Sequence, residues 1–140
     1  MRRLPPSGSK ARDRGAAAVE FALCLPLLLF LVFGIIDFGR LLNAQITLTN
    51  AANAGARLVS LGEPNVVTGT QQAAPGLNGV GVNVQDSCPA GAGPSQDAIV
   101  SVSYSFSFVT PVGALAGLIG GGGFGAPIDL TAQGVAPCED

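Results

Sequence analysis

The first strong pattern along the chain is an apolar run near its beginning. Residues 16–36 read AAAVEFALCLPLLLFLVFGII, and Glu20 is the one charged residue among these twenty-one. A helix rises 1.5 Å per residue, so roughly twenty residues span the roughly 30 Å hydrocarbon core of a bilayer. The run therefore predicts a membrane-spanning helix, and Pro26 within it predicts a kink.

A second apolar pattern follows directly and is amphipathic. Between residues 37 and 61, apolar residues recur at spacings of three and four, with asparagine and threonine on the opposite face. No helix breaker occurs until the sequence Gly62-Glu63-Pro64, which predicts the end of the helix. The membrane segment and residues 37–61 are therefore expected to form one long rod.

The remaining residues, 62–140, contain the alternating pattern of strands. The clearest strand is predicted at 99–109, where valine and aromatic residues alternate with serines, so that one face is apolar and the other is polar and exposed to solvent. Shorter strands are predicted at 80–85 and 128–136, the second weakened by Gly134. We therefore predict an α+β fold in which the long helix packs on a small antiparallel sheet.

Two segments between these elements lack a regular pattern. Residues 65–78 are expected to form a polar connection, and residues 111–124 (PVGALAGLIGGGGF) an apolar, glycine-rich one. The glycines do not form a phosphate-binding loop, because no Lys followed by Ser or Thr comes after them. The glycine-rich connection is instead expected to contact the membrane or another subunit.

Charge is sparse and unevenly distributed along the chain. Charged residues make up 11% of the 140, with seven basic and nine acidic, yet five of the basic residues precede residue 15. Basic residues before the apolar run and Asp37 after it place the beginning of the chain in the cytoplasm and the rest outside. The basic cluster is short, lacks aromatic residues and precedes an acidic chain, which argues against a nucleic-acid-binding protein.

Residue types that catalyse reactions or bind metals are scarce. Histidine is absent, and three cysteines without histidine argue against a metal site. The carboxylates of the exported part show no base–nucleophile spacing, so we interpret them as solvated surface groups and expect neither an enzyme nor a cofactor. These carboxylates belong to Asp86, Asp97, Asp129 and Glu139.

The three cysteines fall into two environments. Cys88 and Cys138 both lie outside by this topology, where an oxidising compartment favours a disulfide between them. Such a bond closes a loop of about fifty residues and contributes roughly 4 kcal/mol in the chain-entropy model. Two free thiols are the alternative. Cys24 lies in the apolar run and is expected to pack as a small hydrophobic residue.

A further pattern joins the beginning of the chain to the apolar run. Gly15 is followed by four small or apolar residues, then by Glu20 and Phe21, and the run closes with Asp-Phe-Gly-Arg at residues 37–40. Over this stretch the chain strongly resembles the TadE-like pseudopilins of tight-adherence (Flp) pilus systems. The likeness continues more loosely as far as Arg57.

The resemblance implies that residues 1–15 are a basic leader, removed by a prepilin peptidase at the membrane. Cleavage between Gly15 and Ala16 would leave 125 residues that begin with the membrane helix. Glycine has no Cβ, so Gly15 suits a scissile bond that catalytic carboxylates must approach closely. Glu20 and Phe21 are then residues for recognition during processing and assembly.

Glu20 carries the clearest functional expectation. An ionised carboxylate at the centre of a membrane helix costs roughly 2.5–3.5 kcal/mol, and less near an interface. The resemblance implies that Glu20 pairs with the N-terminal amine of a neighbouring subunit, which neutralises the charge and fixes the axial register. The alternatives are pairing with the amine of its own chain and an interfacial position among lipid headgroups.

Together these inferences predict a minor, pilin-like structural subunit of a tight-adherence pilus that takes part in assembly, adhesion and surface attachment. Its expected partners are the inner membrane, the prepilin peptidase, other pilins and pseudopilins and the assembly platform. The expected location is the bacterial cell membrane, crossed once, with incorporation into a surface pilus as a further expectation. The alternative is an uncleaved bitopic protein whose exported domain binds a ligand or a partner.

Overall fold

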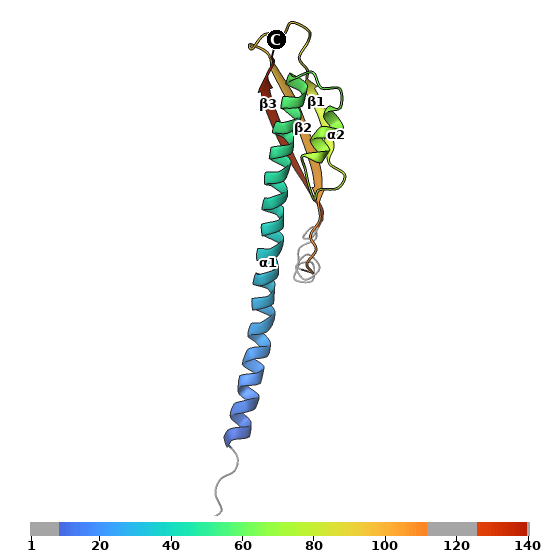
Figure 1. Ribbon diagram of the computed structural model, residues 1–140. Helices are drawn as coiled ribbons and strands as arrows, with labels where there is room; N and C mark the ends of the chain where they lie inside the picture. Colours follow the sequence, from blue (N-terminus) through green and yellow to red (C-terminus); the bar gives the residue numbers. More distant parts are fainter. Residues whose placement is uncertain (1–8, 112–125, 140) are drawn as a thin grey trace, which may run out of the picture.

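The computed structural model describes residues 9–111 and 126–139. Its main element is α1 (Ser9–Ser60), a helix of 52 residues whose upper part lies along a three-stranded sheet (Figure 1). At 1.5 Å per residue this helix is about 78 Å long, and its lower half extends beyond the sheet. The predicted α+β fold, one long helix packed on a small antiparallel sheet, is confirmed.

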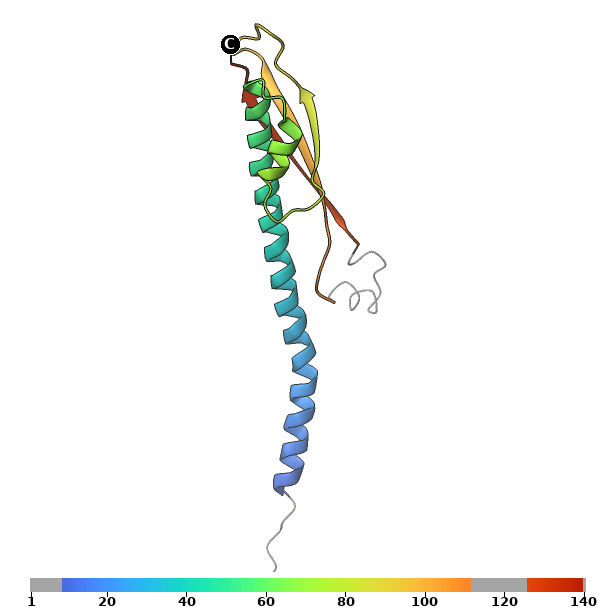
Figure 2. The same ribbon diagram turned by 45° about the vertical axis from the view of Figure 1, so that its right-hand side comes forward.

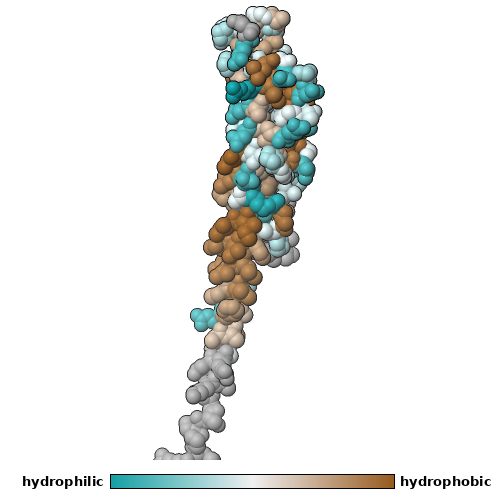
Figure 3. All heavy atoms as spheres, in the orientation of Figure 1, coloured by the Kyte–Doolittle hydropathy of each residue, from teal (hydrophilic) through white to brown (hydrophobic). Residues whose placement is uncertain are grey.

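The lower half of α1 is an apolar rod. It is long and apolar enough to cross a membrane, and its large apolar side chains are exposed along most of residues 19–36. Figure 3 shows the apolar surface that these side chains form on one side of the molecule. Pro26 lies inside the helix, and Figures 1 and 2 show gentle curvature without a sharp bend, so the predicted kink is absent.

The sheet is an antiparallel meander, and the strand with alternating serines lies at its centre. Val102 of this strand pairs with Val82 on one side and with Ala132 on the other. Its apolar positions are buried against α1 and its serines lie on the opposite face, as the alternation predicts. In spatial order the strands are β1 (Gly81–Asp86), β2 (Asp97–Phe106) and β3 (Ile128–Pro137).

The core lies between the upper part of α1 and the inner face of the sheet. The helix contributes mainly alanine, and the sheet contributes Ala98, Val100, Val102, Phe106 and Leu130. A Cβ added to Gly134 of β3 would overlap the backbone carbonyl of Ala52 in α1. Gly134 therefore has a packing role that the sequence did not reveal, because it allows the strand to approach the helix backbone directly.

A short helix, α2 (Val66–Gln72), occupies part of the segment that the sequence predicted to be a polar connection. It packs on α1 through Thr70, which is completely buried and whose hydroxyl donates to the Val66 carbonyl at 2.7 Å. A Cβ on Gly55 of α1 would lie 2.5 Å from the Thr70 Oγ1 atom. The prediction at 65–78 was wrong because seven residues are too few to show a helical apolar period.

Two other expectations concern the chain around the end of β2. The predicted strand at 99–109 ends at Phe106, where the pairing with Ile128 of β3 is the last of the ladder. The next residues leave the sheet and pass beside α1. The predicted glycine-rich connection at 111–124 lies outside the described residues, except for Pro111.

Candidate functional site

The predicted processing segment lies on the free lower part of α1. Gly15, Ala16, Glu20 and Phe21 are all helical and exposed, and a Cβ on Gly15 would meet nothing within 4 Å. Because the peptide bond after Gly15 is inside a helix, a protease must unwind the helix locally to reach it. Little packing opposes this unwinding on the side of Ala16, since Gly15 and the residues that follow it are exposed.

Glu20 projects from this apolar part of the helix. Among the described residues, its carboxylate has neither a hydrogen-bond partner nor an ion-pair partner. In lipid, its charge would have to be compensated by a group from outside these residues. The geometry is therefore compatible with a partner amine, and it does not by itself select between the amine of a neighbouring subunit and that of the same chain.

A second group of polar residues, which the sequence did not assign, lies where β2 ends beside α1. Asp37 is 3% exposed. Its carboxylate accepts hydrogen bonds from the backbone N–H of Val109 at 3.4 Å, from that of Thr110 at 3.3 Å, and from the Thr110 hydroxyl. The Arg40 guanidinium lies 3.4 Å from the same carboxylate. We call Asp37, Arg40, Val109 and Thr110 the Asp37 cluster.

The Asp37 cluster favours an ionised carboxylate. The Thr110 hydroxyl is the main cause that holds the pKa of Asp37 below its ordinary value of 3.8. The backbone N–H groups of Val109 and Thr110 and the Arg40 side chain act in the same direction, while burial acts in the opposite direction. Groups of the chain itself thus stabilise the negative charge.

Aromatic contacts reinforce the attachment of β2 to α1 at this point. The Arg40 guanidinium carbon lies 5.3 Å from the centre of the Phe106 ring, a cation–π distance. The Phe106 ring meets the Phe108 ring edge to face, with centroids 5.6 Å apart and planes at 89°. Arg40 therefore contacts both the Asp37 carboxylate on α1 and the Phe106 ring on β2.

The sequence contained a signal for half of this cluster. Asp37 and Arg40 stand in the Asp-Phe-Gly-Arg pattern at the end of the apolar run, which contributed to the family resemblance. Their partners Val109 and Thr110 lie about seventy residues further along the chain. No spacing pattern connects residues at that separation, so only the tertiary structure brings them together.

Two of the three cysteines are joined at the end of the sheet opposite to the Asp37 cluster. Cys88 and Cys138 form a disulfide with a Cα–Cα distance of 5.7 Å, which connects the chain after β1 to the end of β3. The Cys138 N–H also donates to the Gln96 carbonyl at 2.8 Å. Cys24 is a free cysteine and is exposed on the lower part of α1.

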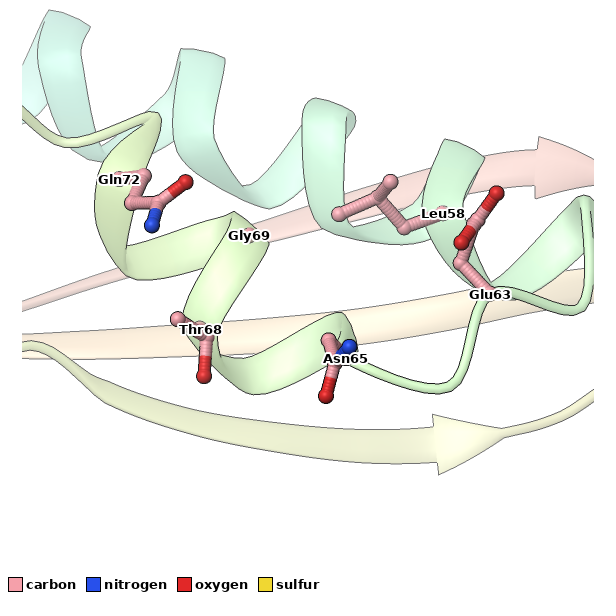
Figure 4. Close-up of a pocket in the computed structure, with 6 residues that line it drawn as sticks. All are labelled: Leu58, Glu63, Asn65, Thr68, Gly69 and Gln72. Carbon is pink, nitrogen blue, oxygen red and sulfur yellow. The ribbon is translucent and has the colours of Figure 1, made fainter.

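An open hollow lies between the end of α1 and α2. Its polar side chains include a single carboxylate, that of Glu63, so the hollow contains no pair of ionisable groups for acid–base chemistry. In the described parts of the chain, no three potential metal ligands come together. Figure 4 shows the lining residues, which are Leu58, Glu63, Asn65, Thr68, Gly69 and Gln72.

Comparison with known protein families gives a match that falls on α1. The family model of TadE-like proteins matches residues 15–57. No curated protein and no solved structure matches the chain. The matched segment includes Glu20 and Phe21 as well as Asp37 and Arg40, so it covers both groups of candidate residues on the helix.

The match concerns a structural family associated with pili rather than a family of enzymes. It supports a pilin-like protein that is associated with a tight-adherence pilus and with the membrane machinery around it. The resemblance inferred from the sequence is confirmed over the same residues, because residues 15–57 of α1 match the family model of TadE-like proteins.

Proposed function

We propose that this chain is a minor structural subunit of a tight-adherence pilus, anchored in the membrane by residues 16–36 and processed after Gly15. The family match on a helix whose lower half is exposed and separate from the sheet carries this proposal. In such a molecule the lower half of α1 is available to lipid or to other helices. The sheet and the upper half of α1 form an exported head.

Processing follows from the position of the cleavage site in this arrangement. The basic residues of the leader, residues 1–15, hold the beginning of the chain at the cytoplasmic surface. The exposed Gly15–Ala16 bond is then presented at the membrane boundary to a prepilin peptidase. Removal of the leader creates a new ammonium group at Ala16, four residues before Glu20.

Assembly follows from the unpaired charge of Glu20 in the apolar rod. The amine of Ala16 in a neighbouring subunit would neutralise the carboxylate, and it would fix how far one rod slides along another. Only one axial offset brings the two charges together, so the pair specifies register. Adhesion and surface attachment would follow from the pilus that these subunits help to assemble.

The processing claim is tested by the intact mass and N-terminal sequence of chain co-expressed with its prepilin peptidase. We expect the wild-type chain to lose residues 1–15 and to begin at Ala16, whereas Gly15→Ala stays at full length. Gly39→Ala is the matched control, because a Cβ at either glycine meets nothing within 4 Å. Full-length wild-type chain beside a peptidase that cleaves its major pilin would contradict the proposal.

The assembly claim needs a variant that is still processed. We expect Glu20→Gln to be cleaved normally and to be depleted at least tenfold from cross-linked pilus assembly complexes, because the amide cannot compensate the partner amine. Equal recovery of Glu20→Gln and wild type would contradict the charge-pairing role. Normal pili and attachment with Gly15→Ala would favour the uncleaved bitopic alternative.

A further inference from the structure

The Asp37 cluster lies at the level where the proposed membrane helix leaves the hydrocarbon. Residues 16–36 as a helix are about 31 Å long, close to the roughly 30 Å hydrocarbon thickness. The headgroup layer on each side adds about 5–8 Å, or roughly three to five helical residues. If residues 16–36 span the membrane, Asp37 and the residues just after it lie in the headgroup layer.

Hydrogen bonds bring the end of β2 to the same level. The Val109 N–H donates to the Asp37 carboxylate at 3.4 Å, so Val109 lies at the depth of Asp37. We call residues 107–111, the described chain that follows β2, the strap. Figure 1 shows the chain after β2 continuing downward beside α1, below the paired part of the sheet.

Apolar side chains are exposed at this level on both elements. Val109 of the strap is 72% exposed, and Phe38 of α1 is 62% exposed. Exposure of these apolar surfaces to water would be unfavourable, but they adjoin the apolar run that ends at Ile36. Continuity with a membrane-spanning surface identifies lipid as the partner that covers them.

The charges of the cluster suit the same partner. The Asp37 carboxylate is nearly buried and hydrogen-bonded, so it presents little negative charge to lipid. The Arg40 side chain remains 46% exposed, although it contacts Asp37 and the Phe106 ring. An arginine in this position can bury its stem and direct its guanidinium to lipid phosphate.

We propose that the strap is a lipid-contacting foot of the head, which Asp37 holds on α1. Val109 and Phe38 insert among the headgroups and the upper acyl chains, and Arg40 faces phosphate. This inference rests on the membrane anchorage proposed above. The helix and the foot give the head two points of contact with the membrane, which define its tilt relative to the membrane plane. With the helix as the one point of contact, this tilt would not be fixed.

The chain contains no tryptophan, so single tryptophans can report depth in the membrane. The three sites are Val109 in the strap, Leu28 within the proposed span and Val135 at the far end of the sheet, which is 55% exposed. Each full-length Trp variant is placed in phosphatidylcholine vesicles with or without brominated acyl chains. We expect strong quenching by bromine at Leu28→Trp, at least twofold quenching at Val109→Trp and none at Val135→Trp.

The role of Asp37 is tested in the Val109→Trp background. Asp37→Ala should reduce the quenching to the level of Val135→Trp, while the quenching at Leu28→Trp stays unchanged. Thr110→Val removes only the hydroxyl donor and should give a partial loss, which guards against general unfolding by the stronger variant. Full quenching of Val109→Trp in both variants would overturn the role of Asp37.

The quenching results also distinguish failure of the lipid-contacting foot from failure of the membrane anchor. Quenching at Leu28→Trp without quenching at Val109→Trp would overturn the foot and leave the anchor intact. A blue shift at Val109→Trp that appears only at high protein-to-lipid ratio would assign the surface to a second copy, which also overturns the lipid contact. Absence of quenching at Leu28→Trp would overturn the anchor and the foot together.

Discussion

Asp37 occupies the boundary between the two halves of this molecule. On one side of it lies an apolar helix without packing partners in the described chain, and on the other lies a helix that is packed on a sheet. The side chain is buried at this boundary and accepts three hydrogen bonds from Val109 and Thr110. A single carboxylate thus attaches the end of β2 to the point where the rod becomes part of the head.

This attachment should make the stability of the head depend on pH. Because the pKa of Asp37 is lower in the folded chain, its contribution to stability is fully present above the ordinary pKa of 3.8 and is lost as pH falls through the lower, folded value. We expect the thermal midpoint of wild type in detergent to exceed that of Asp37→Asn at neutral pH. The two midpoints should converge as the pH falls below 3.8 and through the lower pKa of folded Asp37, as followed by circular dichroism.

Asp129→Asn is the matched control for that measurement. Asp129 is exposed on β3, and its carboxylate accepts no hydrogen bond from the described residues, so its amide variant should follow the wild-type curve. A constant difference between wild type and Asp37→Asn across the acidic range would contradict the assigned role of the Asp37 charge.

At the scale of elements, the close approach of β3 to α1 determines the shape of the head. The helix presents small side chains at its contact with the sheet, and β3 has no side chain at Gly134, where its backbone approaches that of the helix. Alternation correctly predicted which face of β2 is buried. It could not predict the contact at Gly134, because the identity of the opposing residue, Ala52, depends on how the helix is rotated against the sheet.

Gly134→Ala tests this contact directly. The added Cβ would overlap the Ala52 carbonyl, which belongs to backbone and cannot move aside as a flexible side chain would. We expect a loss of about 1–3 kcal/mol in the free energy of unfolding, measured by urea denaturation in detergent.

Gly39→Ala is the comparison, because a Cβ there meets nothing within 4 Å and alanine favours a helix over glycine by about 1 kcal/mol. The two substitutions should therefore change stability in opposite directions. Equal effects would show that the helix and the strand are not in direct contact at Gly134.

The boundaries of elements were less predictable than their existence. The alternating pattern continues to 109, but β2 ends at Phe106 because the next residues bond to Asp37 instead of to a strand. The helix α2 was not predicted because it has only seven residues and its buried residue, Thr70, packs against Gly55 of α1. In both places a tertiary contact overrode the local pattern.

At the scale of the whole molecule, the head is closed at one end by the disulfide and held at the other by Asp37. The Cys88–Cys138 bond joins residues fifty positions apart, so in the chain-entropy model its removal should cost about 4 kcal/mol. We expect Cys88→Ser to lower the urea midpoint by a corresponding amount, and reduction of the wild type to have the same effect. Cys24→Ser should leave the midpoint unchanged, because Cys24 is a free thiol on the rod.

The same bond reports the compartment of the head. In a Cys24→Ser background, an exported head should resist alkylation in cell lysate until it is reduced, since an oxidising compartment maintains the disulfide. Cys88→Ser in that background supplies the positive control, because it leaves Cys138 free to react. Alkylation of both thiols before reduction would contradict export of the head.

Local patterns in the sequence were enough to predict the apolar rod, its amphipathic continuation, the three strands and the TadE-like segment over residues 15–57. Periodicity and composition are properties of neighbouring residues, so they can be read along the chain. The tertiary structure alone decided the Asp37 cluster, the contact at Gly134 and the packing of α2. Each depends on residues far apart in sequence, whose meeting is set by how the helix and the sheet pack.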